Sequence, residues 1–230
     1  MVSKCPKCDF ENVDWEDFCR RCRANLHPSS PYTLRIEEFA FPEDKDAIDG
    51  LKAIEPIPTL VNKAVDLFQR PAIQNRLLAN AQRVDEETFP EVYSLAKACG
   101  KILCLDIFPE IYVIHSPELN AFTVGGNDAP IIILYSSLIQ RMVDGELATI
   151  IGHEMGHVKS AHPPYHTLVY LLARGILSLG VFATLSIPLQ LMLSSWHRDS
   201  EITADRASLI VTGNIDVVKR AQIKLRLGLG

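Results

Sequence analysis

The sequence has no excess of positive charge. It carries 23 Lys and Arg against 28 Asp and Glu, a formal net charge of −5, with a pI of about 5.8. Domains that bind nucleic acid usually present a basic surface to the phosphate backbone. The short cluster of Arg20, Arg21 and Arg23 is interpreted as a solvated surface, so we expect no nucleic-acid partner.

The chain also lacks an apolar stretch behind its first methionine. Met1 to Lys4 lead directly into a cysteine motif, where a secretion signal would have its apolar core. We therefore expect a cytoplasmic protein. Its 230 residues leave room for one core of ordinary size and a small additional unit.

Four cysteines near the N-terminus form two CxxC motifs, at Cys5 and Cys8 and at Cys19 and Cys22. Four thiolates at this spacing suit tetrahedral Zn²⁺, as in a zinc ribbon. The alternatives are disulfides or a redox CxxC, but no βαβ pattern surrounds these residues. Residues 1–23 are too short for an apolar core, so the metal would supply their folding free energy. We predict a zinc ribbon at 1–23 and a linker at 24–32.

The strongest motif for chemistry is His153-Glu154-Met155-Gly156-His157. On a helix, two histidines four residues apart project from one face and can bind one Zn²⁺ together. Glu154 directly follows the first histidine, where it can act as a general base on a water activated by the metal. The alternative is an ordinary amphipathic helix with two solvent-facing histidines.

Such a site needs a third ligand. The metzincin pattern requires Gly and His where this chain has Ser160 and Pro163, so that subclass is excluded. His162 is too close along the helix to reach the metal, and we expect it to make a hydrogen bond or to lie at the surface. Glu201 is better placed, because it heads an ExxxD pattern within a predicted helix at 196–212.

Asp205 lies one helical turn beyond Glu201. Its carboxylate could accept the spare N–H of a metal-binding imidazole and so fix the ring orientation. The alternative for both acidic residues is a charged, solvated helix face.

Three ordered segments, 120–126, 146–157 and 198–206, carry a family resemblance. The chain resembles the gluzincin metallopeptidases related to the HtpX heat-shock protease and the CAAX prenyl endopeptidase. The resemblance spans roughly residues 85–225. It implies that residues 33–230 form a zincin-like domain. In that domain His153, His157 and Glu201 would be the zinc ligands, Glu154 the general base, and Asp205 a neighbour of one ligand. The resemblance also implies that Asn120 and Ala121 lie on an edge strand that pairs with extended substrate.

The pattern of elements agrees with an edge strand. Short β-branched runs at 111–115, 120–124 and 130–135 are separated by turn residues and predict a three-stranded sheet. The alternative for Asn120 is a turn residue. Helices are predicted at 58–69, 71–83 and 88–99. The fold class is therefore α+β and mostly helical, with a zincin-like core, a small sheet, an HExxH helix and a preceding zinc ribbon.

Residues 168–193 are almost wholly apolar and have no charged residue from Gly175 onward. Because His157 and Glu201 must meet at one metal, any crossing of a membrane would have to be reversed, and two crossings need roughly 40 apolar residues. We therefore expect a helical hairpin, broken near Gly175–Gly180 or at Pro188. It would be buried, or would contact a membrane surface or a protein partner.

These features predict a metalloendopeptidase that cleaves unfolded or extended proteins, with one catalytic and one structural Zn²⁺. The resemblance also implies a residue well beyond Glu201 that donates a hydrogen bond to the oxyanion. His197 is a candidate to take this role instead, and the alternative is that it is a surface histidine. Two alternatives remain. One is a zinc-binding adaptor that uses the ribbon and the apolar segment for partners, and the other is an amidohydrolase for non-peptide substrates.

Overall fold

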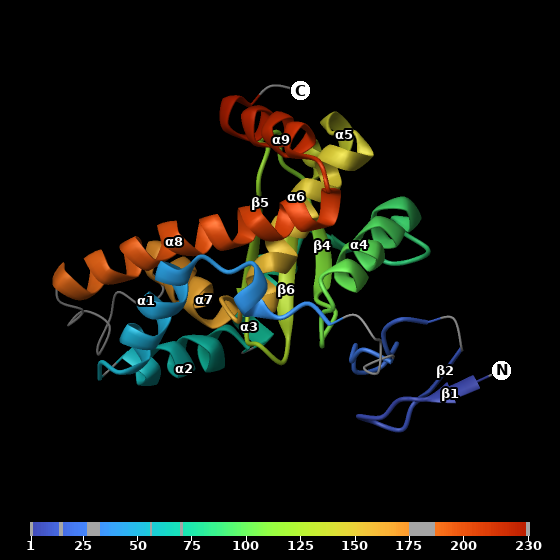
Figure 1. Cartoon of the computed structure of the whole chain (residues 1–230). Helices are drawn as coiled ribbons and strands as arrows, with labels where there is room; N and C mark the ends of the chain where they lie inside the picture. Colours follow the sequence, from blue (N-terminus) through green and yellow to red (C-terminus); the bar gives the residue numbers. More distant parts are fainter. Residues whose placement is uncertain are drawn as a thin grey trace.

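The computed structural model describes residues 2–13, 16–26, 33–55, 57–69, 71–174 and 187–228. It confirms an α+β, mostly helical architecture (Figure 1). The elements are β1 (Val2–Lys4), β2 (Glu11–Val13), a 3₁₀ turn (Ile36–Glu38), α1 (Pro42–Lys52), α2 (Ile57–Phe68), α3 (Pro71–Leu78), β3 (Ala81–Arg83), α4 (Pro90–Ile102), β4 (Glu110–Ile114), β5 (Ala121–Gly125), β6 (Pro130–Tyr135), α5 (Ser136–Arg141), α6 (Asp144–Lys159), α7 (Pro163–Ala173), α8 (Ile187–Thr212) and α9 (Ile215–Leu227).

The main sheet has the strand order β3-β4-β6-β5. Strand β4 is parallel to β6, whereas β3 pairs with β4 and β5 pairs with β6 in antiparallel fashion. The three predicted strands are present, but the prediction of a three-stranded sheet and of a helix over 71–83 was wrong. Helix α3 ends at Leu78, and Ala81–Arg83 form a fourth strand because they hydrogen-bond to β4, a tertiary contact that overrides local propensity.

Strand β6 explains why the sheet sits inside the molecule. Ile132 and Leu134 point into a hydrophobic core with α4 and α6. Their neighbours Ile131 and Ile133 point to the opposite face, into a second core with α2 and α7. A strand buried on both faces reads as a continuous apolar run, as this one does. Strand β5 lies at the edge of the sheet, with α6 and α7 packed against it.

Helix α6 lies at the centre of the helical layer, where α8 crosses it (Figure 1). Gly156 permits this crossing. A Cβ at that position would lie 2.6 Å from the Cβ of Ala207 and 3.1 Å from the Cα of Ala204. Because glycine has no Cβ, the backbones of α6 and α8 can approach each other closely at this point. Gly156 directly precedes His157, and Ala204 lies three residues after Glu201, so the close approach brings these two ligands together.

The segment before α1 is attached to α8 through polar contacts. The backbone N–H of Phe41 donates to Thr203 Oγ1 at 3.0 Å. The Arg206 guanidinium donates to the carbonyls of Phe39 and Ala40, at 3.3 and 3.0 Å. Residues 39–41 therefore hold the N-terminal helices against the helix that carries Glu201.

The apolar segment is described only in part. Helix α7 ends at Ala173 and α8 begins at Ile187, so the predicted break near Gly175–Gly180 lies outside the described residues. Pro188 does not break α8, because it lies in the first turn, where proline is tolerated. No helix in the described part of the chain is long and apolar enough to cross a membrane.

Candidate active site and metal centres

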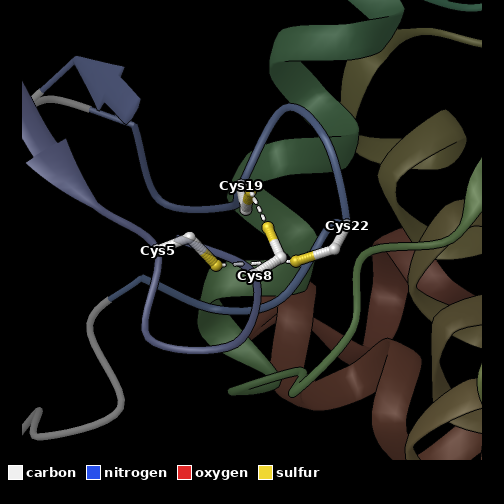
Figure 2. A group of neighbouring side chains, drawn as sticks. All are labelled: Cys5, Cys8, Cys19 and Cys22. Carbon is white, nitrogen blue, oxygen red and sulfur yellow. Dashed lines mark hydrogen bonds between the residues drawn. The ribbon is translucent and has the colours of Figure 1, made fainter. Parts of the chain in front are cut away.

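The four N-terminal cysteines converge on one point, with their sulfur atoms facing one another (Figure 2). Cys5 Sγ lies 3.5 Å from Cys22 Sγ, and Cys8 Sγ lies 3.7 Å from Cys19 Sγ. A disulfide would need about 2.05 Å. In contrast, a tetrahedron with Zn–S bonds of about 2.3 Å has edges of about 3.8 Å. The donor set therefore fits a structural zinc ion.

The protonation of this cluster also suits a metal. Burial works to raise the pKa of Cys19, but backbone N–H groups, among them that of Arg21, lower it to about 6. Burial raises the pKa of Cys22 to about 12. A low-pKa thiol supplies one thiolate readily, and a bound cation would draw the remaining protons from its neighbours.

The cysteine-rich unit packs on the rest of the protein rather than standing apart from it. The Phe18 ring lies 5.0 Å from that of Phe108, centroid to centroid, within the core that includes α6. Buried Glu16 binds Lys97 of α4 at 2.9 Å. Burial opposes ionisation of Glu16, yet the hydrogen bonds from Lys97 and Arg20 hold its pKa below the usual value. The predicted domain boundaries at 23 and 32 stay a prediction.

The second centre joins α6 and α8. His153 and His157 project from one face of α6, and their Nε2 atoms are 3.2 Å apart. Glu201 of α8 completes the set, with Oε2 3.2 Å from His153 Nε2 and Oε1 3.5 Å from His157 Nε2. A tetrahedral zinc ion with ligands at about 2.0–2.1 Å needs ligand separations of about 3.3–3.4 Å. The three residues therefore fit a zinc ion.

The charges of these three residues differ in the metal-free protein. Burial tends to lower the pKa of His153, but hydrogen bonds with Asp205 and Glu201 raise it to about 10. Burial lowers the pKa of His157 to about 3. Burial opposes ionisation of Glu201, yet its hydrogen bonds with both histidines hold its pKa well below the usual value. A zinc ion must therefore displace a proton from His153, whereas His157 and Glu201 already expose lone pairs.

Glu154 lines the same cavity as the ligands, and its carboxylate is hydrogen-bonded to the edge strand. Its Oε2 accepts a hydrogen bond from Thr123 Oγ1 of β5 at 2.6 Å. Glu154 is buried, with 5% of its surface exposed. Burial raises the pKa of its carboxyl group, which moves it toward the range in which a carboxylate is an effective base near neutral pH.

Asp205 supports the first histidine. Its Oδ1 lies 3.0 Å from His153 Nδ1, and the same oxygen accepts a bond from Gln222 of α9 at 2.7 Å. If Nε2 of His153 binds the metal, its Nδ1 carries the proton and donates to Asp205. This hydrogen bond fixes both the tautomer and the ring orientation.

A second chain of contacts, which the sequence analysis missed, supports His157. His157 Nδ1 lies 3.0 Å from His162 Nδ1, and His162 Nε2 lies 3.0 Å from Asp44 Oδ2. The Asp44 carboxylate also accepts from Trp196 Nε1 at 3.0 Å and Thr203 Oγ1 at 2.6 Å. Burial disfavours its charge, but these donors hold its pKa below the usual value. His162 had been expected to make a hydrogen bond or to lie at the surface, and it is buried and hydrogen-bonded.

The Asp44 carboxylate can only accept hydrogen bonds, and this fixes which ring nitrogens of His157 and His162 carry protons when a metal is bound. A metal on Nε2 of His157 leaves the proton on Nδ1, which must donate to His162 Nδ1. His162 then carries its own proton on Nε2 and donates it to Asp44. Each ring nitrogen in the chain then has one defined role, as donor, acceptor or metal ligand.

These residues open into a cavity of about 400 Å³. Its walls come from β5, α6, α7, α8 and α9, and the residues are Asn120, Ala121, Phe122, Ile150, His153, Glu154, His157, His166, His197, Glu201, Asp205, Gln222, Leu225 and Arg226. The structure thus brings together all the residues predicted for the catalytic centre. It adds His166, which the sequence analysis did not single out although it lies four residues after His162.

Two histidines on a buried helix, a glutamate from a second helix and a glutamate base define the gluzincin class of zinc peptidases. Residues 93–226 match the model of peptidase family M48, and the chain belongs to this family. It is 30% identical over 212 residues to the plastoglobule-localized metallopeptidase 48, chloroplastic, of Arabidopsis thaliana. The match covers 90% of this chain and 60% of that relative. No solved structure matches the chain.

Proposed function

We propose that this protein is a zinc-dependent endopeptidase that cleaves unfolded or extended polypeptides, with one catalytic and one structural zinc ion. One observation carries the proposal. The ligand atoms of His153, His157 and Glu201 have the separations of a zinc tetrahedron, and the buried Glu154 carboxylate stands beside them in a cavity bordered by an edge strand.

Zinc held by these three residues would supply a Lewis acid that polarises the scissile carbonyl and activates a water molecule. Glu154 takes the proton of the attacking water and passes it to the leaving amine. Thr123 directs this carboxylate through its 2.6 Å hydrogen bond, and burial raises the pKa of Glu154. A non-catalytic adaptor would have no need for a buried, positioned base at this point.

The edge strand favours peptides as substrates over small amides. Strand β5 pairs only with β6 among the described residues, so its other edge can add an extended chain by backbone hydrogen bonds. At one end, Thr167 of α7 closes this edge, because it accepts from the N–H of Gly125 and donates to its carbonyl. At the other end, Asn120 and Ala121 line the cavity, and the Ala121 N–H donates to the Asn120 side chain at 2.9 Å rather than to another strand. We assign substrate pairing there, where an extended chain would replace this local bond.

His197 is the proposed donor to the developing oxyanion. It lies on α8 one turn before Glu201 and lines the same cavity. Its Nδ1 has no hydrogen-bond partner among the described residues, so it can serve a bound group. Such donors commonly contribute about 3–4 kcal/mol to transition-state stabilisation.

The decisive experiment compares wild type with Glu154→Gln for zinc content and casein cleavage. The substitution keeps the size of the side chain but removes the base, so zinc should stay bound while hydrolysis falls by about 10²-fold or more. Glu43→Gln, at an exposed position on α1, is the matched control and should cleave like wild type. A zinc-loaded wild type that cleaves no unfolded protein or peptide would contradict the proposal.

We also propose that the protein is cytoplasmic and that residues 168–193 attach it to a membrane surface. Within the described part, Leu191 and Met192 expose 65% and 37% of their surface. The Arabidopsis relative is named as plastoglobule-localized. Leu191→Glu should release the protein from membrane fractions, whereas Leu209→Glu, at another exposed leucine of α8, should not. If neither the wild type nor the control sediments with membranes, the attachment is refuted.

A further inference from the structure

Two histidines that the proposed reaction does not use as zinc ligands are in edge-to-face contact in the wall of the cavity. His166 comes from α7 and His197 from α8, and their rings are 5.2 Å apart at an angle of 86°. His166 Nε2 and His197 Nδ1 are buried atoms without a hydrogen-bond partner among the described residues. A buried polar atom left unpaired is destabilising, so these two nitrogens point to a ligand that both could bind.

Glu201 supplies a third donor at the same place. His197 and Glu201 are four residues apart on α8, the spacing that puts two side chains on one helix face. Glu201 Oε1 lies 3.6 Å from His197 Nδ1, while Oε2 lies against His153 at 3.2 Å. One ligand atom from each of His166, His197 and Glu201 falls within 4.8 Å of the others. Oε1 therefore lies between His157 Nε2, at 3.5 Å, and His197 Nδ1, so it can serve either the catalytic ligand set or this second one.

We propose that His166, His197 and Glu201 form a second transition-metal site in the cavity, which shares the Glu201 carboxylate with the catalytic zinc. The donor set of two imidazoles and one carboxylate suits Zn²⁺ and similar divalent ions. The donors lie within 4.8 Å of one another, and zinc requires about 3.3–3.4 Å, so metal binding would turn these side chains toward one another. Because Glu201 is shared and the His197 side chain is 45% exposed, this site binds more weakly than the first.

The neighbouring histidines do not offer an equivalent site. His157, His162 and His166 also lie within range of one another. However, Nδ1 of His157 and both nitrogens of His162 are engaged in the chain that ends at Asp44. A metal there would break at least one buried hydrogen bond of this chain, whereas a metal at His166 and His197 breaks none that the structure shows.

An ion at this second site would lie in the cavity that the peptide must enter. It would also draw one oxygen of Glu201 away from the catalytic zinc. We therefore expect zinc in excess of the catalytic ion to inhibit hydrolysis. This consequence rests on the proposed peptidase function, but metal binding at the site does not.

The test measures zinc stoichiometry of the full chain by equilibrium dialysis against buffered zinc over a wide concentration range. Wild type should bind two ions tightly and a third with at least about 10-fold weaker affinity, a difference comparable with the loss of one supporting contact at a metal ligand. His166→Asn and His197→Asn should each lose the third ion and keep the first two. His115→Asn, which removes an exposed histidine outside the cavity, should keep all three.

The proposal is overturned if wild type saturates at two ions, or if both variants still bind three. It is also overturned if His115→Asn loses the third ion, since binding would then be at the surface. In a parallel assay, excess zinc should inhibit casein cleavage by wild type, and His166→Asn should be several-fold less sensitive. If wild type cleaves nothing, the proposed function fails, but the stoichiometry still decides the metal site.

Discussion

The hydrogen-bond chain from His157 to Asp44 makes a specific prediction for Asp44→Asn. In wild type the Asp44 carboxylate can only accept hydrogen bonds, so His162, Trp196 and Thr203 all donate to it. Asparagine keeps one acceptor oxygen and replaces the other with an NH₂ group. If its oxygen stays with Trp196, its NH₂ group donates to His162, and the proton of His162 must move to Nδ1. That nitrogen then faces His157 Nδ1 at 3.0 Å with a proton of its own.

The conflict arises only when zinc binds. In the metal-free variant, His157 can shift its proton to Nε2 and donate to Glu201 Oε1, 3.5 Å away, so the reversed chain remains satisfied. Zinc needs the lone pair on Nε2 and forces the proton back to Nδ1, where two donors would then face each other. A buried unsatisfied donor costs about 1–3 kcal/mol. Zinc affinity at this site should therefore fall by about 10- to 100-fold, the usual loss when such a supporting contact is removed.

A competition titration with a chromogenic chelator measures this affinity, and circular dichroism of the metal-free protein checks the fold. Asp46→Asn, at an exposed position on the same helix, is the control for the change in charge and should bind zinc like wild type. The cysteine cluster should retain its ion in both variants. A folded Asp44→Asn protein whose catalytic zinc binds within about twofold of wild type would refute this account of the hydrogen-bond chain.

Three further predictions concern the metal sites. Glu201→Ala should lose roughly 10- to 100-fold or more in zinc affinity at the catalytic site and should also lose the weaker third ion, while the cysteine cluster keeps its ion; unchanged stoichiometry and affinity would remove Glu201 from the ligand set. The double variant Cys5→Ser and Cys8→Ser should lose the structural zinc but keep the catalytic zinc. Its thermal unfolding midpoint should fall, because Phe18 then packs less firmly on the core. Loss of both ions would show that the two centres fold as one unit. Without metal the pKa of His153 is about 10, so each catalytic zinc should displace one proton from this ligand. Zinc affinity should therefore rise by about tenfold per pH unit from pH 6 to 8. Calorimetry in buffers of different ionisation enthalpy measures the released proton, and finding none would contradict this prediction.

The metal ligands and Asp205 could be predicted from the sequence, because their positions depend only on local helical geometry. His153, His157, Glu201 and Asp205 were found from spacing because residues three or four apart on a helix share a face, whatever the rest of the fold does. The comparison with family M48 confirms the predicted family, and the structure confirms the fold class. The run at 120–124 predicted a strand, and the family resemblance implied its edge position, which the strand order shows for β5.

The residues that could not be predicted act through long-range contacts. Asp44 sits in a charged stretch that looks like any solvated helix start, and only its packing against His162 and Trp196 shows that it is buried. The docking of Phe18 on Phe108 was hidden for the same reason, since neither position has a local pattern. A signal for His162 and His166 did exist. Both follow the HExxH motif at helical spacing around a Pro-Pro pair, which places them near His157.

The contacts of residues 39–41 and Asp44 with α8 bear on where the catalytic unit begins. The family match starts at residue 93, yet the Asp44 carboxylate that ends the His157 chain lies well before it. The bonds from Phe41 and Arg206 likewise tie that earlier segment to the Glu201 helix. A fragment trimmed to the matched region would leave His162 and Trp196 without their acceptor. The zinc-binding unit of this chain therefore begins upstream of the region that matches the family, and a fragment of residues 93–226 should fold poorly and bind zinc weakly.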